Sequence, residues 1–282
     1  MDTPFVNLRL ARRFEALKAK QRAALVVYLA ANDPDRATST ALMQQLPESG
    51  ADIIELGMPF TDPMADGPAI QKAALRALDA GASMQTTLQQ VRDFRSVDDE
   101  TPVVLMGYYN PIDSYGAEAF AQDAAAAGVD GVIVVDVPPE EAHELHPFLE
   151  ANGIAFVMLA TPTSDSERLP KILKYAGGFL YYVSILGVTG TRTAVVDTVD
   201  TAIKKIKTQT DLPVAVGFGI KTPENAAEFA SIADAVVVGS AVINRLETSL
   251  DDAGKATGQL IPNVLDFVTE LAQGVHSASP KN

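Results

Sequence analysis

Eight short apolar runs recur along the chain, separated by segments of mixed polarity. The runs are rich in Val and Ile and almost continuously apolar, which is typical of parallel strands buried on both faces. They cover residues 24–30, 51–57, 102–108, 131–137, 154–160, 178–184, 212–218 and 233–239. The pattern therefore predicts a parallel sheet of eight strands.

The segments between these runs predict helices, and several of them end in glycine, the usual C-terminal stop of a helix. The predicted helices cover residues 40–49, 69–81, 117–128, 139–153, 166–177, 197–210, 222–233 and about 240–272. Eight strand–helix repeats in about 250 residues favour an α/β fold of the (β/α)8 TIM barrel type. A doubly wound open sheet is the competing fold. It usually has fewer repeats and a glycine-rich turn after the first strand, where this chain has AANDPD.

The two ends of the chain lead to different expectations. Leu10, Phe14 and Leu17 have the spacing of one apolar helix face, which predicts an extra N-terminal helix before the barrel. The basic composition of the first 22 residues leaves a transit peptide as an alternative. We expect residues 1–272 to form a single barrel catalytic domain and residues 273–282 to form a flexible C-terminal tail.

Composition excludes several classes of function. The 282 residues carry a net charge of −14, which disfavours nucleic acid or an anionic membrane as a partner but leaves a small anionic ligand open. The absence of cysteine excludes a disulfide scaffold, a thiolate nucleophile and a cysteine-ligated zinc. No apolar run approaches the ~20 residues that span a bilayer.

Three carboxylates lie close together where the second predicted strand ends, in ELGMPFTDPMADGP. Glu55 interrupts an apolar strand, and the alternation of side chains places it opposite Ile54 and Leu56. If Glu55 lies in the barrel mouth, desolvation would raise its pKa toward neutrality, which suits a general acid or base. The alternative is a structural glutamate that is buried and hydrogen-bonded to a neighbouring hydroxyl or amide. Asp62 before proline and Asp66 before glycine also suit turns or a helix cap. The three carboxylates would suit Mg²⁺, although nothing else in the sequence indicates a metal site.

Glycines follow the last two predicted strands, in AVGFGI and VVVGSAVI. Barrels often bind phosphate with these two loops and the N-terminus of a short extra helix. Gly217, Gly219 and Gly239 would allow a close approach of backbone N–H groups to an anion, and Ser240 would add a hydroxyl. Tight turns that need only glycine are the alternative.

The connection over residues 184–197 is long for a barrel loop and contains two glycines and three threonines. It predicts either a lid that closes over phosphate or a plain surface loop. His143 and His146 would share a helix face and suit a metal, but a solvated surface is the simpler interpretation. His276 falls in the expected tail, so no histidine-based catalytic triad is apparent.

Five motifs together resemble the tryptophan synthase alpha subunit family, in the right order and over essentially the whole chain. They are ELGMPFTDPMADGP, LMGYYNPI, GVDGVIVVDVPPEE, YYVSILGVTGTR and GFGI. The resemblance implies a (β/α)8 barrel lyase of L-tryptophan biosynthesis. Its expected reaction is the retro-aldol cleavage of indole-3-glycerol phosphate to indole and glyceraldehyde 3-phosphate.

The resemblance also implies site residues. Glu55 and Asp66 match the catalytic carboxylates of the family: Glu55 would transfer protons, and Asp66 would accept a hydrogen bond from the indole N–H. The positions that match substrate-binding residues are Tyr28, Tyr181, Thr189, Gly190, Phe218, Gly219, Gly239 and Ser240.

A beta-subunit partner follows from the same resemblance, with an alpha2-beta2 heterotetramer expected in the cytoplasm. Asp62, Pro63, Asn110, Pro111 and Pro138 match the residues that face this partner. No metal and no cofactor is expected in this chain, because the pyridoxal phosphate of the family's complete enzyme lies in the beta subunit.

Two departures from the family pattern concern the loops. Ile185 stands where members can carry arginine, which puts a charged anchor of the lid in doubt, and Asn32 replaces a common glycine. Asparagine tolerates left-handed backbone, so the turn can survive. Two other functions remain open: a different barrel enzyme acting on a phosphorylated substrate, such as a sugar-phosphate isomerase, and a non-enzymatic activator of a beta-type partner.

Overall fold

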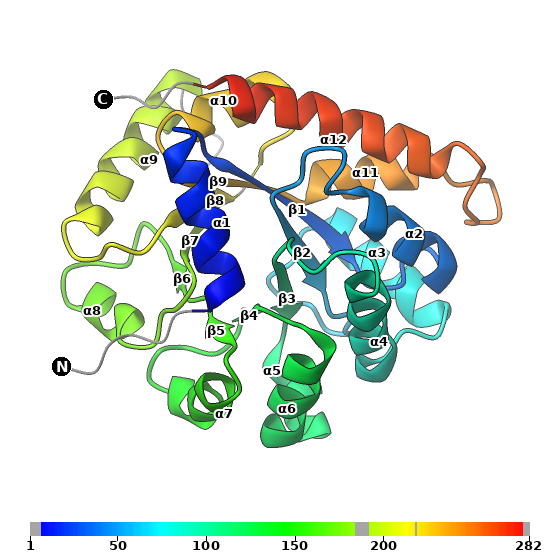
Figure 1. Ribbon diagram of the computed structural model, residues 1–282, viewed down its shortest axis with the longest axis horizontal. Helices are drawn as coiled ribbons and strands as arrows, with labels where there is room; N and C mark the ends of the chain where they lie inside the picture. The colour runs from blue at the N-terminus through cyan, green and yellow to red at the C-terminus, as the bar shows by residue number, and fades with distance from the viewer. Residues whose placement is uncertain (1–6, 184–191, 218, 279–282) are drawn as a thin grey trace.

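The strands of the computed structural model form one parallel sheet that curls into a barrel (Figure 1). The structure describes residues 7–183, 192–217 and 219–278, without the side chains of residues 192–194. The strand order is β5-β4-β3-β2-β1-β9-β8-β7-β6. The strands are β1 Ala24–Ala30, β2 Ile53–Gly57, β3 Val103–Gly107, β4 Gly131–Val134, β5 Ala155–Phe156, β6 Leu159–Ala160, β7 Leu180–Val183, β8 Val214–Gly217 and β9 Ala235–Val238.

The first and last strands of this order, β5 and β6, are consecutive in the chain and only Val157 and Met158 separate them. They are two halves of the fifth predicted strand. The sheet therefore closes on itself through one broken strand, and the predicted (β/α)8 barrel is confirmed.

Helices surround the barrel and follow the strands in the predicted alternation (Figure 1). Two described helices, α4 and α5, were not predicted, and the single helix predicted over about 240–272 is divided into α11 and α12. The helices are α1 Leu8–Ala19, α2 Arg36–Gln45, α3 Pro68–Asp79, α4 Met84–Arg95, α5 Tyr109–Tyr115, α6 Ala117–Ala127, the 3-10 helix η1 Ala142–Glu144, α7 His146–Ala151, α8 Arg168–Leu173, α9 Arg192–Lys207, α10 Pro223–Ala230, α11 Ser240–Glu247 and α12 Leu260–Ser277.

The strands divide their side chains between two cores. In β1, Leu25 and Val27 pack outward against the helices, whereas Val26 belongs to the cluster inside the barrel. Helix α1 closes the N-terminal end of this inner cluster with the predicted face of Leu10, Phe14 and Leu17. The extra N-terminal helix is therefore confirmed, and it leaves the carboxyl ends of the strands as the open end of the barrel.

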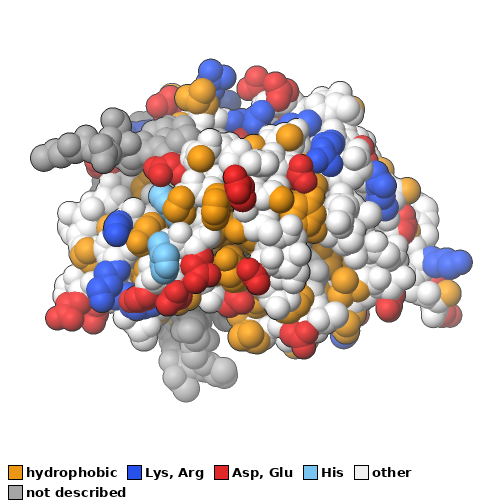
Figure 2. Space-filling view, turned by 90° about the horizontal axis from the view of Figure 1, so that it is seen from below, with side chains coloured by type: hydrophobic (Ala, Val, Ile, Leu, Met, Phe, Trp, Pro, Cys, Tyr) orange, Lys and Arg blue, Asp and Glu red, His pale blue; other side chains and the backbone are white. Residues whose placement is uncertain are grey.

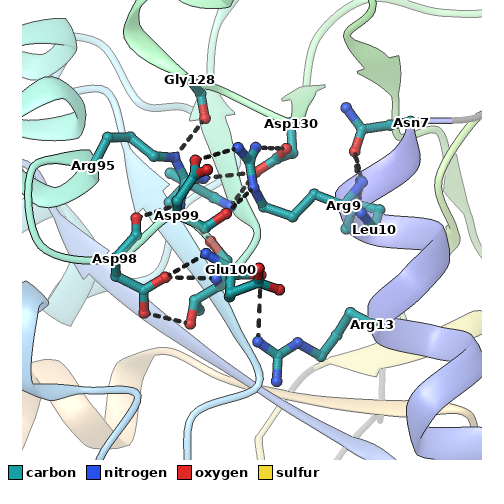
Figure 3. Close-up of polar contacts among 12 residues, drawn as sticks. Asn7, Arg9, Leu10, Arg13, Arg95, Asp98, Asp99, Glu100, Gly128 and Asp130 are labelled. Carbon is teal, nitrogen blue, oxygen red and sulfur yellow. Dashed lines mark hydrogen bonds and ion pairs between the residues drawn. The ribbon is translucent and has the colours of Figure 1, made fainter.

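An ion-pair network holds α1 against the closed end of the barrel (Figure 3). The Asp130 carboxylate, 1% exposed, pairs with Arg9 of α1 and with Arg95 of α4, and it accepts a 2.8 Å hydrogen bond from the Val103 N–H. Arg9 also pairs with the exposed Asp99 at 2.9 Å. The network thus ties α1 to the starts of β3 and β4.

The expected tail is shorter than predicted, because α12 continues to Ser277. Val275 is fully buried, and His276 Nε2 lies 3.4 Å from the buried Asp52 Oδ2. The boundary after residue 272 is therefore wrong. Gly274 permits close packing of this helix end: a Cβ atom there would lie 2.4 Å from the Pro223 carbonyl oxygen.

Candidate active site

Glu55 lies inside the barrel at the carboxyl end of β2. Its strand neighbours Ile54 and Leu56 pack outward, so alternation turns Glu55 inward, beside Tyr28 in the register of β1 and β2. The residue is 3% exposed, and no hydrogen-bond partner for its Oε2 atom lies among the described residues. Burial, together with the nearby charge of Asp66, raises the pKa of Glu55 to about 8. A carboxyl of this kind holds its proton at neutral pH and can exchange it with a ligand.

Asp66 is half-buried in the loop between β2 and α3. Burial raises its pKa, and a hydrogen bond from the Tyr108 hydroxyl opposes that rise. Because Asp66 raises the pKa of Glu55, the two carboxyl groups share one electrostatic site. The structure thus brings together the two predicted catalytic residues.

Tyr108 belongs to this site, although it was not among the residues predicted from the sequence. The residue is 2% exposed, and it directly follows β3. Its hydroxyl accepts a 3.0 Å hydrogen bond from the Ala65 N–H, and its ring lies 5.7 Å from the Phe60 ring. Burial is the main cause that raises the pKa of Tyr108 to about 12, so it stays a donor to Asp66. Its place at the end of a predicted strand was the available signal.

Tyr28 and Tyr181 each lie over a glycine of the neighbouring strand. A Cβ atom at Gly57 would lie 2.1 Å from the Tyr28 hydroxyl oxygen, and one at Gly217 would lie 2.0 Å from the Tyr181 hydroxyl oxygen. Burial raises the pKa of both tyrosines well above the usual value, and the charge of Glu55 adds to the shift. Both predicted tyrosines therefore lie near Glu55 as protonated groups.

The glycines of the predicted phosphate site lie at the ends of two adjacent strands: Gly217 is the last residue of β8, Gly219 lies beyond it, and Gly239 follows β9. Gly219 has a left-handed φ of +74°, and among the described residues no atom lies within 4 Å of a Cβ atom built there. Gly239 packs against Tyr28, since a Cβ atom there would lie 3.3 Å from the Tyr28 Cβ. Ser240 is exposed and begins helix α11, whose free N–H groups suit an anion. Thr189, Gly190 and Phe218, like most of the predicted lid, lie outside the described residues.

The residues predicted to face a partner are accessible at the same end of the barrel. Asp62, Asn110 and Pro138 are exposed, whereas Pro63 and Pro111 are half-buried. A groove of about 330 Å³ is lined by Tyr109, Asn110, Asp113, Asp136, Val137, Pro138, Glu141 and Glu144. Figure 2 shows acidic side chains gathered next to histidines on one face of the molecule.

The two histidines of this region do not form the metal pair that their spacing suggested. His143 lies in η1, exposed beside Glu141 and Glu144. His146 begins α7 and is half-buried, with its ring 5.2 Å from the Tyr175 ring and 6.4 Å from the Phe156 ring. The solvated surface predicted for both histidines therefore holds only for His143.

Proton transfer is the chemistry that the open end of this barrel suits. The group of raised pKa lies where the strands end, and barrel enzymes carry out catalysis there. A second carboxyl and two protonated tyrosines surround it. The fold and site therefore define a (β/α)8-barrel enzyme of the acid–base type.

Comparison with known proteins narrows this class. The family model described as tryptophan synthase alpha chain matches residues 14–273. The alpha chain from Legionella pneumophila is 41% identical, with a TM-score of 0.85 over 95% of this chain and 97% of that chain. A chain of Mycobacterium tuberculosis tryptophan synthase is 37% identical, with a TM-score of 0.84 over 95% of this chain and 98% of that chain.

The chain belongs to the tryptophan synthase alpha chain family, and the resemblance found in its sequence is confirmed. It is therefore a lyase of tryptophan biosynthesis, and the family reaction cleaves indole-3-glycerol phosphate. No helix in the described part of the chain is both long enough and apolar enough to cross a membrane.

Proposed function

We propose that Glu55 and Asp66 carry out the retro-aldol cleavage of indole-3-glycerol phosphate in this chain, which releases indole and glyceraldehyde 3-phosphate. The observation that supports this proposal most directly is the buried Glu55, whose pKa is raised to about 8 beside a second carboxyl group. A carboxyl of that pKa can both give and take a proton near neutral pH.

Cleavage requires two proton transfers around one carbon–carbon bond. Glu55 gives its proton to C3 of the indole ring, and the ring becomes an electron sink with positive charge on its nitrogen. The hydroxyl on the adjacent side-chain carbon then loses its proton as that carbon becomes the aldehyde. The electrons of the broken bond return to the ring, so the products balance without water or a cofactor. The carboxylate left on Glu55 is the base for the second transfer.

Asp66 stabilises the charge that develops on the ring. Its carboxylate accepts a hydrogen bond from the indole N–H, and this bond strengthens as the nitrogen becomes positive. Tyr108, which directly follows β3, positions Asp66. Its hydroxyl donates a hydrogen bond to Asp66 and accepts one from the Ala65 N–H in the same loop. Tyr28 and Tyr181 flank Glu55 and line the indole pocket, and the family resemblance adds Phe218 to its wall.

The phosphate of the substrate binds beyond β8 and β9. Backbone N–H groups at Gly219, at Gly239 and at the start of α11 are its donors, together with the Ser240 hydroxyl. Two observations support this placement: no described residue fills the Cβ side of Gly219, and Ser240 at the start of α11 is exposed. Thr189 and Gly190 complete the site by the family resemblance.

A beta subunit is the partner that the family implies, and we propose an alpha2-beta2 heterotetramer in the cytoplasm. Asp62, Pro63, Asn110, Pro111 and Pro138 form the contact surface, which their position at the open end of the barrel supports. Pyridoxal phosphate belongs to the beta subunit, and this chain works without a cofactor or metal.

The test compares wild type with Glu55→Gln, which keeps the size of the side chain and removes the transferable proton. Indole and glyceraldehyde 3-phosphate release is measured with the beta partner present. We expect a loss of at least about 100-fold in kcat with substrate binding retained. Full activity in Glu55→Gln would contradict the proposed role of Glu55 in proton transfer. Absence of cleavage by folded wild type would sink the proposed reaction itself.

A further inference from the structure

An ion-paired bridge joins three elements around the open end of the barrel. Asp33 follows β1, and its side chain is 0% exposed. Arg76 of α3 donates to both of its carboxylate oxygens, from Nε at 2.8 Å and from Nη2 at 2.9 Å. On its other side, Arg76 Nη1 lies 4.0 Å from the Glu247 Oε1 atom at the end of α11. Lys72 Nζ lies 3.0 Å from the same oxygen.

The same three elements also share a buried apolar cluster. Tyr28 and Ala30 of β1 pack with Ile70 and Ala73 of α3 and with Ile243 of α11. Figure 1 places α3 and α11 on the same side of the barrel, next to β1. The bridge therefore fixes two helices that already pack on the strand carrying Tyr28.

Each of these helices begins at one end of the proposed substrate site. Helix α3 begins at Pro68, two residues after Asp66, whose carboxylate accepts the hydrogen bond from the indole N–H. Helix α11 begins at Ser240, where the phosphate binds. The positions of the two helices therefore set the separation between the groups that hold opposite ends of one substrate molecule.

Stability alone is a weak reason for such a bridge. Buried ion pairs often contribute little net stability compared with apolar residues of similar volume, because both charges lose their hydration. A bidentate arginine–carboxylate pair does impose a fixed geometry, which a single ammonium group cannot reproduce.

We propose that Arg76 is a positioning residue that sets the separation between Asp66 and the N-terminus of α11, so that both ends of the substrate are held at once. The inference rests on the proposed function, because that function assigns the indole end to Asp66 and the phosphate end to α11. Arg76 acts through Asp33 and through the placement of α3, not on the reacting atoms.

The test is Arg76→Lys in the full chain with its beta partner. A displacement of about 1 Å between catalytic groups costs about 100-fold in rate, so we expect kcat to fall by about 10- to 100-fold. Indole alone and glycerol 3-phosphate alone should bind as in wild type, because indole needs only Asp66, just before α3, and glycerol 3-phosphate needs only the phosphate site at the start of α11. This split between kcat and half-substrate binding is what a merely structural role would not produce.

Arg95→Lys is the matched control. Arg95 is also a mostly buried arginine paired with a buried aspartate, Asp130, but it lies at the closed end of the barrel. The Arg95→Lys substitution should lower the melting temperature and leave kcat unchanged. If Arg76→Lys fails to fold, Glu247→Gln removes only the link to α11, and a smaller loss in kcat with normal half-substrate binding is expected.

Three results would overturn the inference. One is unchanged kcat in both Arg76→Lys and Glu247→Gln. Another is an equal loss of kcat in Arg95→Lys, and the third is loss of half-substrate binding together with kcat. A wild type that does not cleave indole-3-glycerol phosphate would instead overturn the proposed function, so the two failures are distinguishable.

Discussion

Glu55 shows how a single buried side chain makes stability depend on pH. Its pKa rises from 4.5 to about 8 on folding. Between these values the folded chain retains a proton that the unfolded chain has released. The free energy of unfolding that this group contributes therefore falls as the pH rises from about 4.5 to about 8, and it is constant outside that window.

The prediction concerns Glu55→Gln, which cannot titrate. Relative to wild type, the variant should gain stability steadily from about pH 4.5 to about pH 8, because the wild type alone loses stability there through Glu55. Urea unfolding of both proteins over this range measures the difference. A difference that stays constant across the range would show that Glu55 titrates like an ordinary exposed glutamate.

The sequence predicted some site residues better than others, and the reason is local. Glu55 could be predicted because it is a single charge in an apolar strand. The alternation of side chains in that strand shows which face of the sheet it lies on. Tyr108 was not, because its contact with Ala65 and Asp66 exists only once the loop after β2 folds over the end of β3. A long-range contact of this kind leaves no periodic trace in the sequence.

At the scale of elements, the strands were predictable because each corresponds to a short and almost continuously apolar run. The break between β5 and β6 was not, because Val157 and Met158 continue the apolar pattern of the strand. Helix α4 was missed because one helix was expected between consecutive strands. Its buried residues Thr87, Leu88, Val91 and Phe94 have helical spacing and were the available signal.

Helix α12 provides a prediction at this scale. Gly274→Ala should lower the free energy of unfolding by about 1–3 kcal/mol, because the added methyl group collides with the backbone of Pro223. Gln273→Ala, at an exposed neighbouring position of the same helix, is the control and should change stability by less than about 0.5 kcal/mol. Thermal or urea unfolding measures both. Equal stability of the two variants would mean that residues 273–277 do behave as the tail that the sequence suggested.

At the scale of the whole molecule, the barrel separates stability from chemistry. The network around Asp130 lies at the closed end, with α1 and the strand starts, whereas Glu55 and Asp66 lie at the open end. Damage to one end should therefore leave the other end intact in molecules that remain folded.

Asp130→Asn tests this separation. Removal of the buried carboxylate leaves Arg9 and Arg95 without their shared partner and should cost about 3–5 kcal/mol of stability. Well below the melting temperature, kcat for indole release should match wild type. Asp99→Asn is the control: its side chain is 85% exposed, so the loss should be about 0–1 kcal/mol. A fall in kcat for folded Asp130→Asn would contradict the separation.

The tyrosine hydroxyls that lie over Gly57 and Gly217 have a consequence for how this site can evolve. The space that each glycine leaves is already filled by a side chain from the adjacent strand. A larger residue at either glycine is therefore accessible to descendants only after the facing tyrosine has become smaller, and that first step would alter the wall beside Glu55. Each tyrosine and its glycine should therefore change together, although Tyr28 and Gly57 are 29 positions apart along the chain and Tyr181 and Gly217 are 36 positions apart.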